Sequence, residues 1–215
     1  MNAQHESALV VAVSQRVDVW QDRGERRDAL DQQLCAFLVA AGYLPVPVPS
    51  CLANPQTGKE ARLAPLANWL AALRPRAIVL SGGNDIGDCA ERDLTEYALI
   101  DHAQQESLPL LGICRGMQML AVWAGSSLHK LEGHVRTRHT LSAPGEAWPG
   151  EVNSYHGYAI SACPADFAVT ARTQDGSIEA IRHTRLPWEG WMWHPERESP
   201  FATSDLARLH TLFHD

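Results

Sequence analysis

The fold of this chain is decided by one stretch, Leu108-Pro-Leu-Leu-Gly-Ile-Cys-Arg-Gly-Met-Gln-Met-Leu120. The stretch begins as a short apolar run, which is typical of a buried strand, and ends with apolar side chains at helical spacing. Between the two lies Gly112-Ile-Cys-Arg-Gly116, the pattern of a nucleophile elbow with cysteine in the place of serine. The glycines allow a sharp turn from strand to helix, so the sequence predicts that Cys114 lies above the edge of a sheet.

Two interpretations of Cys114 follow from this pattern. At the N-terminus of a helix, the helix dipole favours a thiolate, and the backbone N–H of Arg115 is free to face a developing oxyanion. The alternative is a buried core cysteine, which is the more common fate of an intracellular cysteine. The pattern alone leaves both interpretations open.

The composition predicts a soluble protein with a single domain, residues 1–215, in which 45% of residues are hydrophobic and 20% are charged. The net charge of −7 argues against a nucleic-acid partner. Met1–Glu6 is polar and lacks the features of a signal peptide, and no apolar run is long enough to cross a membrane. The five cysteines show no Cys-x-x-Cys spacing, so we expect reduced thiols in a cytoplasmic protein without a membrane partner.

Strands and helices alternate through the first half of the chain. The pattern predicts strands over 8–14, 43–49, 76–80 and 108–113, and helices over 24–41, 61–73 and 93–106. Prolines in the second strand favour an edge position. This alternation predicts a doubly wound α/β domain with a mostly parallel sheet.

The second half has a different pattern. Residues 151–160 alternate around a His-Gly break, and segments 167–171 and 177–182 are predicted to pair as an antiparallel hairpin. A last short strand over 190–193 leads into His194-Pro-Glu196, and a closing helix follows over 200–214.

His194 and Glu196 supply the groups that a cysteine nucleophile needs, a base and a carboxylate that orients it. Their i, i+2 spacing on an extended segment places both side chains on one side. His156 is a second candidate, as a base, a substrate contact or a structural histidine. No group of His, Cys and Asp has the compact spacing of metal ligands, so we expect no metal and no cofactor.

Two strand ends carry further candidates. Arg16 follows the first strand and is either a substrate contact or a surface arginine. Ser81-Gly-Gly-Asn84 follows another strand, where the N–H of Gly83 either faces an oxyanion or belongs to an ordinary tight turn.

A basic segment follows the elbow helix. Its cationic side chains form either an anion site or a solvated loop; they are His129, Lys130, His134, Arg136, Arg138 and His139.

Taken together, Gly112-Ile-Cys-Arg-Gly-Met-Gln118, His194-Pro-Glu196 and Ser81-Gly-Gly-Asn-Asp85 resemble class I glutamine amidotransferase domains. The chain is most similar to the free-standing γ-glutamyl hydrolase branch (peptidase C26), which includes γ-glutamyl-γ-aminobutyrate hydrolases, and Val152-Asn-Ser-Tyr-His156 is similar to a motif of that branch. The resemblance implies a flavodoxin-like α/β sheet with a small antiparallel extension.

The resemblance also implies roles for individual residues. Cys114 would attack a γ-glutamyl amide and form a thioester, and His194 would protonate the departing amine and then activate water. The N–H groups of Gly83 and Arg115 would hold the oxyanion. The glutamyl head would lie among Gln118, Ser154, Tyr155 and His156.

The leaving group is less constrained, because Gly157-Tyr158 and His129-Lys130 depart from the residues often found in the family. Residues 14–16 and 25–31 are similar to members of bacterial surface-polysaccharide synthesis that hydrolyse γ-glutamyl-CDP-amidate. Arg16 and the basic segment would suit that diphosphate. A glutaminase subunit that supplies ammonia to a separate synthetase is the alternative, and the sequence leaves open whether the protein is a homo-oligomer.

Overall fold

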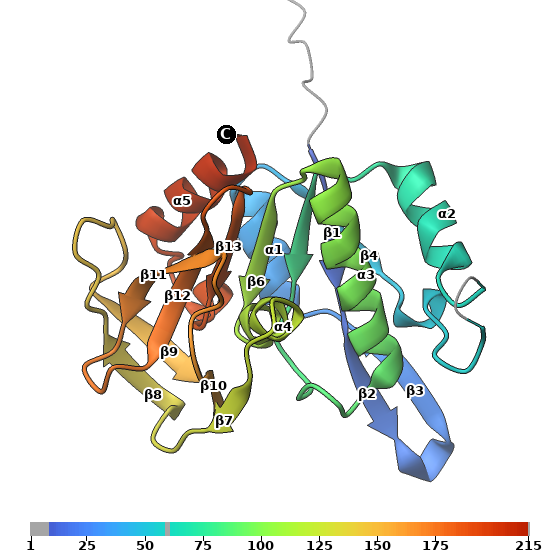
Figure 1. The fold of residues 1–215 in the computed structure, drawn as a ribbon, viewed down its shortest axis with the longest axis horizontal. Helices are drawn as coiled ribbons and strands as arrows, with labels where there is room; N and C mark the ends of the chain where they lie inside the picture. The colour runs from blue at the N-terminus through green and yellow to red at the C-terminus, as the bar shows by residue number, and fades with distance from the viewer. Residues whose placement is uncertain (1–8, 59–60, 215) are drawn as a thin grey trace, which may run out of the picture.

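A seven-stranded sheet forms the centre of the computed structural model, which describes residues 9–58 and 61–214. The expectation that no signal peptide is present rests on Met1–Glu6, and the predicted first strand begins at Ala8. These residues lie outside the described part of the chain. Five neighbouring strands are parallel and two at one edge are antiparallel (Figure 1). In spatial order they are β4 (Leu44–Val48), β1 (Val10–Ser14), β5 (Ala77–Leu80), β6 (Leu110–Ile113), β13 (Trp188–Trp191), β12 (Ile178–His183) and β11 (Phe167–Arg172). The parallel part has the 2-1-3-4-5 order of flavodoxin-like sheets.

Helices cover both faces of the sheet. One face packs against α2 (Ala64–Leu73), α3 (Ala90–Glu106) and α4 (Arg115–Trp123), and the other against α1 (Gln32–Ala40) and α5 (Thr203–His214). Alternate residues of one buried strand supply the two cores: Ile78 belongs to the first and Val79 to the second. The predicted doubly wound α/β architecture is therefore confirmed. Within residues 9–58 and 61–214, no helix is both long and apolar enough to cross a lipid bilayer.

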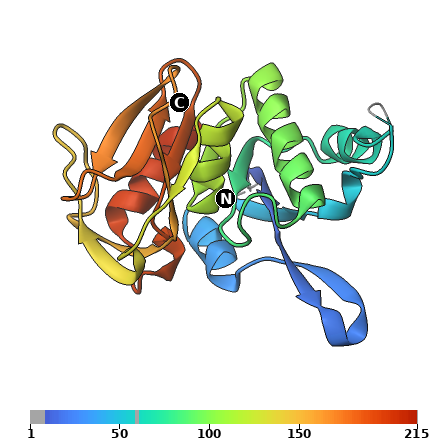
Figure 2. The same cartoon turned by 60° about the horizontal axis from the view of Figure 1, so that its bottom comes forward.

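The predicted helix over 24–41 is wrong in its first third. Residues 16–20 and 25–29 form an antiparallel hairpin of β2 (Arg16–Trp20) and β3 (Glu25–Ala29), with a single 3-10 turn between them. Gly24 accepts the left-handed conformation that this turn requires, with φ of 62°. Helix α1 begins only after Asp31, whose carboxylate caps the backbone N–H of Gln33 at 2.9 Å. The hairpin projects from the body of the molecule (Figure 2).

Two smaller antiparallel pairs complete the fold. β7 (Leu128–Lys130) pairs with β10 (Tyr158–Ile160), and β8 (Val135–Thr140) pairs with β9 (Glu151–Tyr155). The basic segment is therefore largely strand rather than a solvated loop. These pairs, with the antiparallel strands β11 and β12, form the predicted antiparallel extension.

Candidate active site

The candidate residues follow the carboxyl ends of four neighbouring parallel strands. β1 leads to Arg16, β5 to Gly82-Gly83, β6 to Cys114 and β13 to His194. In an open α/β sheet this edge forms the ligand crevice, because the strand ends and the loops after them converge there. The topology thus gathers groups that are up to 178 positions apart in the sequence, since Arg16 and His194 both line one cavity.

Cys114 occupies a strained turn between β6 and α4. Its φ of 50° and ψ of −104° are unfavourable for a residue with a side chain, and such strain concentrates at functional sites. The flanking glycines are needed for close approach rather than for flexibility. A Cβ on Gly112 would lie 2.6 Å from the Gly116 backbone, and one on Gly116 would lie 2.1 Å from the Leu80 carbonyl oxygen. The elbow predicted from the sequence is therefore packed against β5 without room for any side chain.

His194 is held next to Cys114 by three polar contacts. Its Nδ1 lies 2.6 Å from the Glu196 Oε1, so Nε2 is the ring nitrogen left for the contact with Cys114. Asn153 fixes the backbone of His194 on both sides: its Oδ1 accepts from the His194 N–H at 3.0 Å, and its Nδ2 donates to the His194 carbonyl at 2.8 Å. Both His194 and Glu196 are buried.

The electrostatics of this group favour a charged imidazole. Burial opposes the charged form of His194, but the hydrogen bond and charge of Cys114, together with those of Glu196, raise the pKa of His194 to about 10. At neutral pH His194 is therefore protonated, and an imidazolium beside a cysteine is the arrangement that activates the sulfur as a nucleophile.

The loop after β5 lies directly against His194. A Cβ on Gly82 would approach the His194 Cε1 to 2.8 Å, and Gly83 has a φ of 121°, which residues with a side chain rarely adopt. The N–H groups of Gly83 and Arg115 have no hydrogen-bond acceptor within the described chain. Two free donors beside a nucleophile are what an oxyanion hole requires.

The side chains that hold this loop were not predicted from the sequence. Arg92, which is 1% exposed, donates to the carbonyl oxygens of Ser81 and Gly82 at 2.8 and 2.9 Å. The buried carboxylate of Glu96 accepts from Arg92 and from Arg115, and the Arg115 Nε donates to the Asn84 carbonyl at 2.9 Å. The helix begins at Ala90, three residues before the predicted start at Asp93, so the i, i+4 pair Arg92–Glu96 lay only partly within the predicted helix. Such pairs usually lie on a solvated face.

A cavity of about 310 Å³ adjoins this site. Arg16, Asp18, Asp31 and Arg197 contribute charged groups of both signs to its lining, and Gly83, His194 and Glu196 also line it. Arg16 therefore lies where a substrate contact is expected, although its Nε is bonded to the Asp18 carboxylate at 2.8 Å.

The residues expected around the glutamyl head divide into two groups. One donor atom in each of three side chains is bonded to a backbone carbonyl. The Gln118 Nε2 and the His156 Nδ1 bond to the Tyr158 carbonyl at 3.0 and 2.9 Å, and the Ser154 Oγ donates to the His134 carbonyl at 2.7 Å. Tyr155 is 41% exposed, and its ring packs edge-on against the ring of His194 at 5.8 Å. Of the four, only Tyr155 combines exposure with a contact to His194.

The basic segment does not converge on the cavity. Arg138 is paired with Glu151 and Glu198, and His139 packs against the ring of His134 at 4.1 Å. Burial lowers the pKa of His139, so this ring is neutral at neutral pH. Among the described residues that line the cavity, none comes from the basic segment, whose exposed members are His129, Lys130, Arg136 and Arg138. The basic segment therefore adds no cation to this cavity: the rings of His134 and His139 pack against each other, and carboxylates pair with Arg138.

Comparisons with known proteins agree with this geometry. The class I glutamine amidotransferase profile matches residues 54–209. The γ-glutamyl-CDP-amidate hydrolase of Campylobacter jejuni is 36% identical over 130 residues, which cover 58% of this chain and 64% of that protein, less than two thirds of its length. A γ-glutamyl-γ-aminobutyrate hydrolase of Escherichia coli is 28% identical over 219 residues, or 86% of this chain and 85% of that protein.

A solved structure supports the fold. A Thermoplasma acidophilum protein, thought to be one subunit of a GMP synthase, superposes with a TM-score of 0.71 at 21% identity, covering 97% of this chain and 94% of the other.

Proposed function

This chain belongs to the class I glutamine amidotransferase family, and we propose that it hydrolyses a γ-glutamyl amide through a γ-glutamyl thioester on Cys114. Its γ-glutamyl hydrolase relatives support amide hydrolysis in general. The observation that carries the proposal for this chain is the pairing of His194 with Glu196 at 2.6 Å beside a cysteine in a strained elbow. Unpaired cysteines at all five positions fit our expectation of a reducing, cytoplasmic location.

The proposed reaction has two halves. The Cys114 sulfur, whose proton is held by His194, attacks the γ-carbonyl carbon, and the N–H groups of Gly83 and Arg115 stabilise the resulting oxyanion. Cleavage of the carbon–nitrogen bond leaves the thioester, and His194 gives its proton to the departing amine. His194 then takes a proton from water, which attacks the thioester and releases glutamate and the free thiol. Glu196 keeps the imidazole in one orientation throughout.

The charges around the cavity suit the glutamyl head. A free α-amino acid group carries one ammonium and one carboxylate, and Asp18 and Asp31 lie in the lining together with Arg197. The Arg197 guanidinium lies 4.4 Å from the centroid of the Tyr155 ring, and the Tyr155 ring packs against His194. This contact places the charge of Arg197 near His194.

For the leaving group we propose a nucleoside diphosphate amidate, as in surface-polysaccharide phosphoramidate synthesis. The 36% identity to the Campylobacter hydrolase supports this choice, and Arg16 and Arg197 are the cations available at the cavity for a diphosphate. The alternative substrate is γ-glutamyl-γ-aminobutyrate, which the similarity over 86% of the chain favours. A glutaminase subunit is the second alternative, and the fold match to a GMP synthase subunit supports it.

A glutamate-release assay on the purified chain alone tests these choices. Glutamine, γ-glutamyl-γ-aminobutyrate and a γ-glutamyl cytidine diphosphate amidate are offered side by side, and kcat/KM is compared. We expect the nucleotide compound to be preferred, with no partner protein required. Preference for the aminobutyrate compound would replace the proposed leaving group. Absence of turnover with all three, in a protein that is folded by circular dichroism, would favour the partner-dependent glutaminase.

A further inference from the structure

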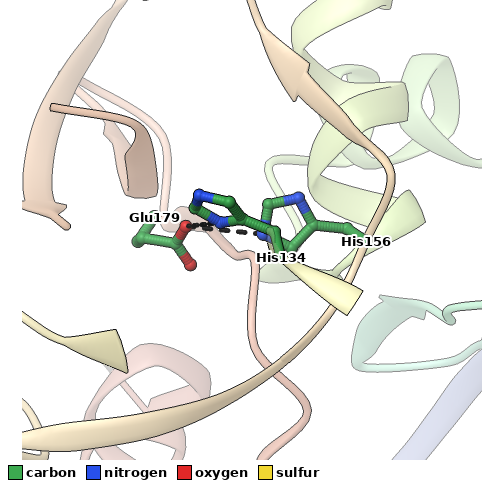
Figure 3. A group of neighbouring side chains, drawn as sticks. All are labelled: His134, His156 and Glu179. Carbon is green, nitrogen blue, oxygen red and sulfur yellow. Dashed lines mark ion pairs between the residues drawn. The ribbon is translucent and has the colours of Figure 1, made fainter. Parts of the chain in front are cut away.

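A second group of buried polar side chains lies outside the catalytic residues. His134, from the loop before β8, and His156, just after β9, both point toward the carboxylate of Glu179 on β12 (Figure 3). The three residues are 2%, 3% and 0% exposed. One ring nitrogen of each histidine and one carboxylate oxygen lie within 4.8 Å of one another.

This group is not satisfied by hydrogen bonds. The His134 Nδ1, the His156 Nε2 and both carboxylate oxygens of Glu179 are buried and have no hydrogen-bond partner among the described residues. An isolated carboxylate in a protein interior is strongly unfavourable unless a positive charge or several donors compensate it. Glu179 therefore needs a positive charge beside it, which either a protonated ring of His134 or His156 or a bound cation would supply.

The outer contacts of the two rings determine which nitrogens carry lone pairs. The His134 Nε2 lies 2.8 Å from the Asp175 carboxylate, and the His156 Nδ1 lies 2.9 Å from the Tyr158 carbonyl. A carboxylate and a backbone carbonyl oxygen both act as acceptors, so the ring nitrogens that face them are the donors. Each ring must then donate outward, and a neutral ring turns a lone pair toward Glu179.

These outer contacts are those of metal-binding histidines. A histidine that ligates a metal almost always donates its other N–H to a carboxylate or a backbone carbonyl, and here one ring does each. The inner distances agree. Glu179 Oε1 lies 3.4 Å from the His156 Nε2 and 3.7 Å from the His134 Nδ1. Both are longer than a normal hydrogen bond, whereas ligands about 2.0–2.1 Å from a tetrahedral zinc are roughly 3.3–3.4 Å apart.

We propose that His134, His156 and Glu179 form a structural site for a zinc-class divalent cation. Two imidazole nitrogens and a carboxylate are a ligand set that zinc uses in proteins. The buried Nε2 of His139, which also has no partner among the described residues, belongs to a ring packed against His134 and is a further nitrogen beside the site. The sequence analysis expected no metal because the three ligands are far apart in the chain.

The site ties together the elements that position the catalytic histidine. His156 follows β9, whose Asn153 holds the backbone of His194 from both sides. Glu179 accepts a backbone hydrogen bond from Met192, two residues before His194, at 2.8 Å. A cation that joins β9 to β12 therefore stabilises the frame around His194 without touching the substrate cavity.

Metal binding is measured directly, with zinc and with cobalt as a spectroscopic probe. The protein is dialysed against a chelator, its metal content is measured, and Co²⁺ is titrated into the chelated protein. We expect one equivalent of cation per chain, visible absorption bands of tetrahedral cobalt, and a lower Tm after chelation that Zn²⁺ restores. A Cys114→Ser background removes the reactive thiol as a competing ligand.

Three variants localise the site. Glu179→Gln keeps the shape of the side chain and removes its charge, and we expect it to abolish stoichiometric binding, while Asp175→Asn weakens binding by about 10- to 100-fold. His129→Gln, on an exposed histidine outside the group, serves as the matched control and should bind normally. Lack of binding to the folded parent protein would overturn the proposal and indicate that a proton fills the gap. Cobalt–thiolate charge-transfer bands, or unchanged binding in Glu179→Gln, would overturn it as well.

Discussion

Two buried histidine–carboxylate groups in this molecule differ in spacing and in origin. His194 and Glu196 are two residues apart in the chain and 2.6 Å apart in space, whereas His156 and Glu179 are distant in the chain and 3.4 Å apart. The first distance accommodates a shared proton and the second is too long for one. Under the two proposals above, a difference of less than 1 Å separates a pair suited to proton transfer from a group suited to cation binding.

The two groups also differ in what surrounds them. His194 borders a cavity and faces Cys114, so its proton can reach a substrate. The group around Glu179 is closed, and its outer contacts fix both rings in place. We therefore assign chemistry to the first group and stability to the second.

The largest effect is expected from Cys114→Ala, which removes the nucleophile that the first group serves. We expect kcat to fall by about 10⁵- to 10⁶-fold, as in other hydrolases that lose a member of the catalytic unit, while the substrate still binds. Cys51→Ala, on an exposed cysteine, is the control and should leave kcat unchanged. Retained turnover in Cys114→Ala would exclude the thioester mechanism.

Exchanging the two carboxylates for amides tests the comparison itself. Glu196→Gln should lower kcat by roughly 10³- to 10⁴-fold, because the imidazole loses its orienting charge. Glu179→Gln should instead lower the Tm of the metal-loaded protein and change kcat far less. Equal losses of kcat in both variants would show that the two groups act as one unit.

The pH dependence sharpens the assignment of His194. Because Cys114 and Glu196 raise its pKa above the ordinary value of 6.5 to about 10 against the effect of burial, the stability that this pair contributes is fully present below pH 6.5. That stability is lost as the pH rises toward 10. In Glu196→Gln the pKa of His194 falls, so the alkaline limb of the kcat/KM profile should move to lower pH. An alkaline limb that stays in place would assign it to another group.

A smaller effect is expected from Gly116→Ala, which tests the packing of the elbow. The added Cβ would lie 2.1 Å from the Leu80 carbonyl oxygen, and relieving such an overlap costs about 1–3 kcal/mol in free energy of unfolding. Gly150→Ala is the matched control, since a Cβ there would meet no atom within 4 Å. Urea denaturation measures both, and equal stabilities would refute the close approach.

The smallest effects concern the leaving group. Arg16→Ala should raise KM for the nucleotide substrate by about tenfold, which corresponds to 1.4 kcal/mol, and leave KM for γ-glutamyl-γ-aminobutyrate nearly unchanged. Arg138→Ala, which removes an ion pair with Glu151 and Glu198 on the surface, should change neither KM and should alter stability by less than about 1 kcal/mol. A selective rise of KM in Arg138→Ala would restore the basic segment as the anion site.

Local patterns predicted the elements that depend on local physics. The strand–glycine–cysteine–glycine–helix pattern predicted the elbow. The i, i+2 spacing of His194 and Glu196 also predicted their contact, although Glu196 lies in a 3-10 turn (Pro195–Arg197) and not on the expected extended segment. The hairpin of β2 and β3 was not predicted, because residues 25–29 have charged side chains that fit the first turn of a helix equally well. Only the pairing with residues 16–20 favours a strand there.

The sequence by itself determined the doubly wound fold, the position of Cys114 in its elbow and the partnership of His194 with Glu196. These features arise from hydrophobic periodicity, glycine geometry and short spacing, which act over a few residues. The tertiary structure alone decided that Arg92 supports the loop of Gly83, that the rings of His134 and His139 pack together, and that His134, His156 and Glu179 meet. Those arrangements depend on contacts between β8, β9 and β12 or between a helix and a distant loop, and residues brought together by strand order leave no periodic signal in the chain.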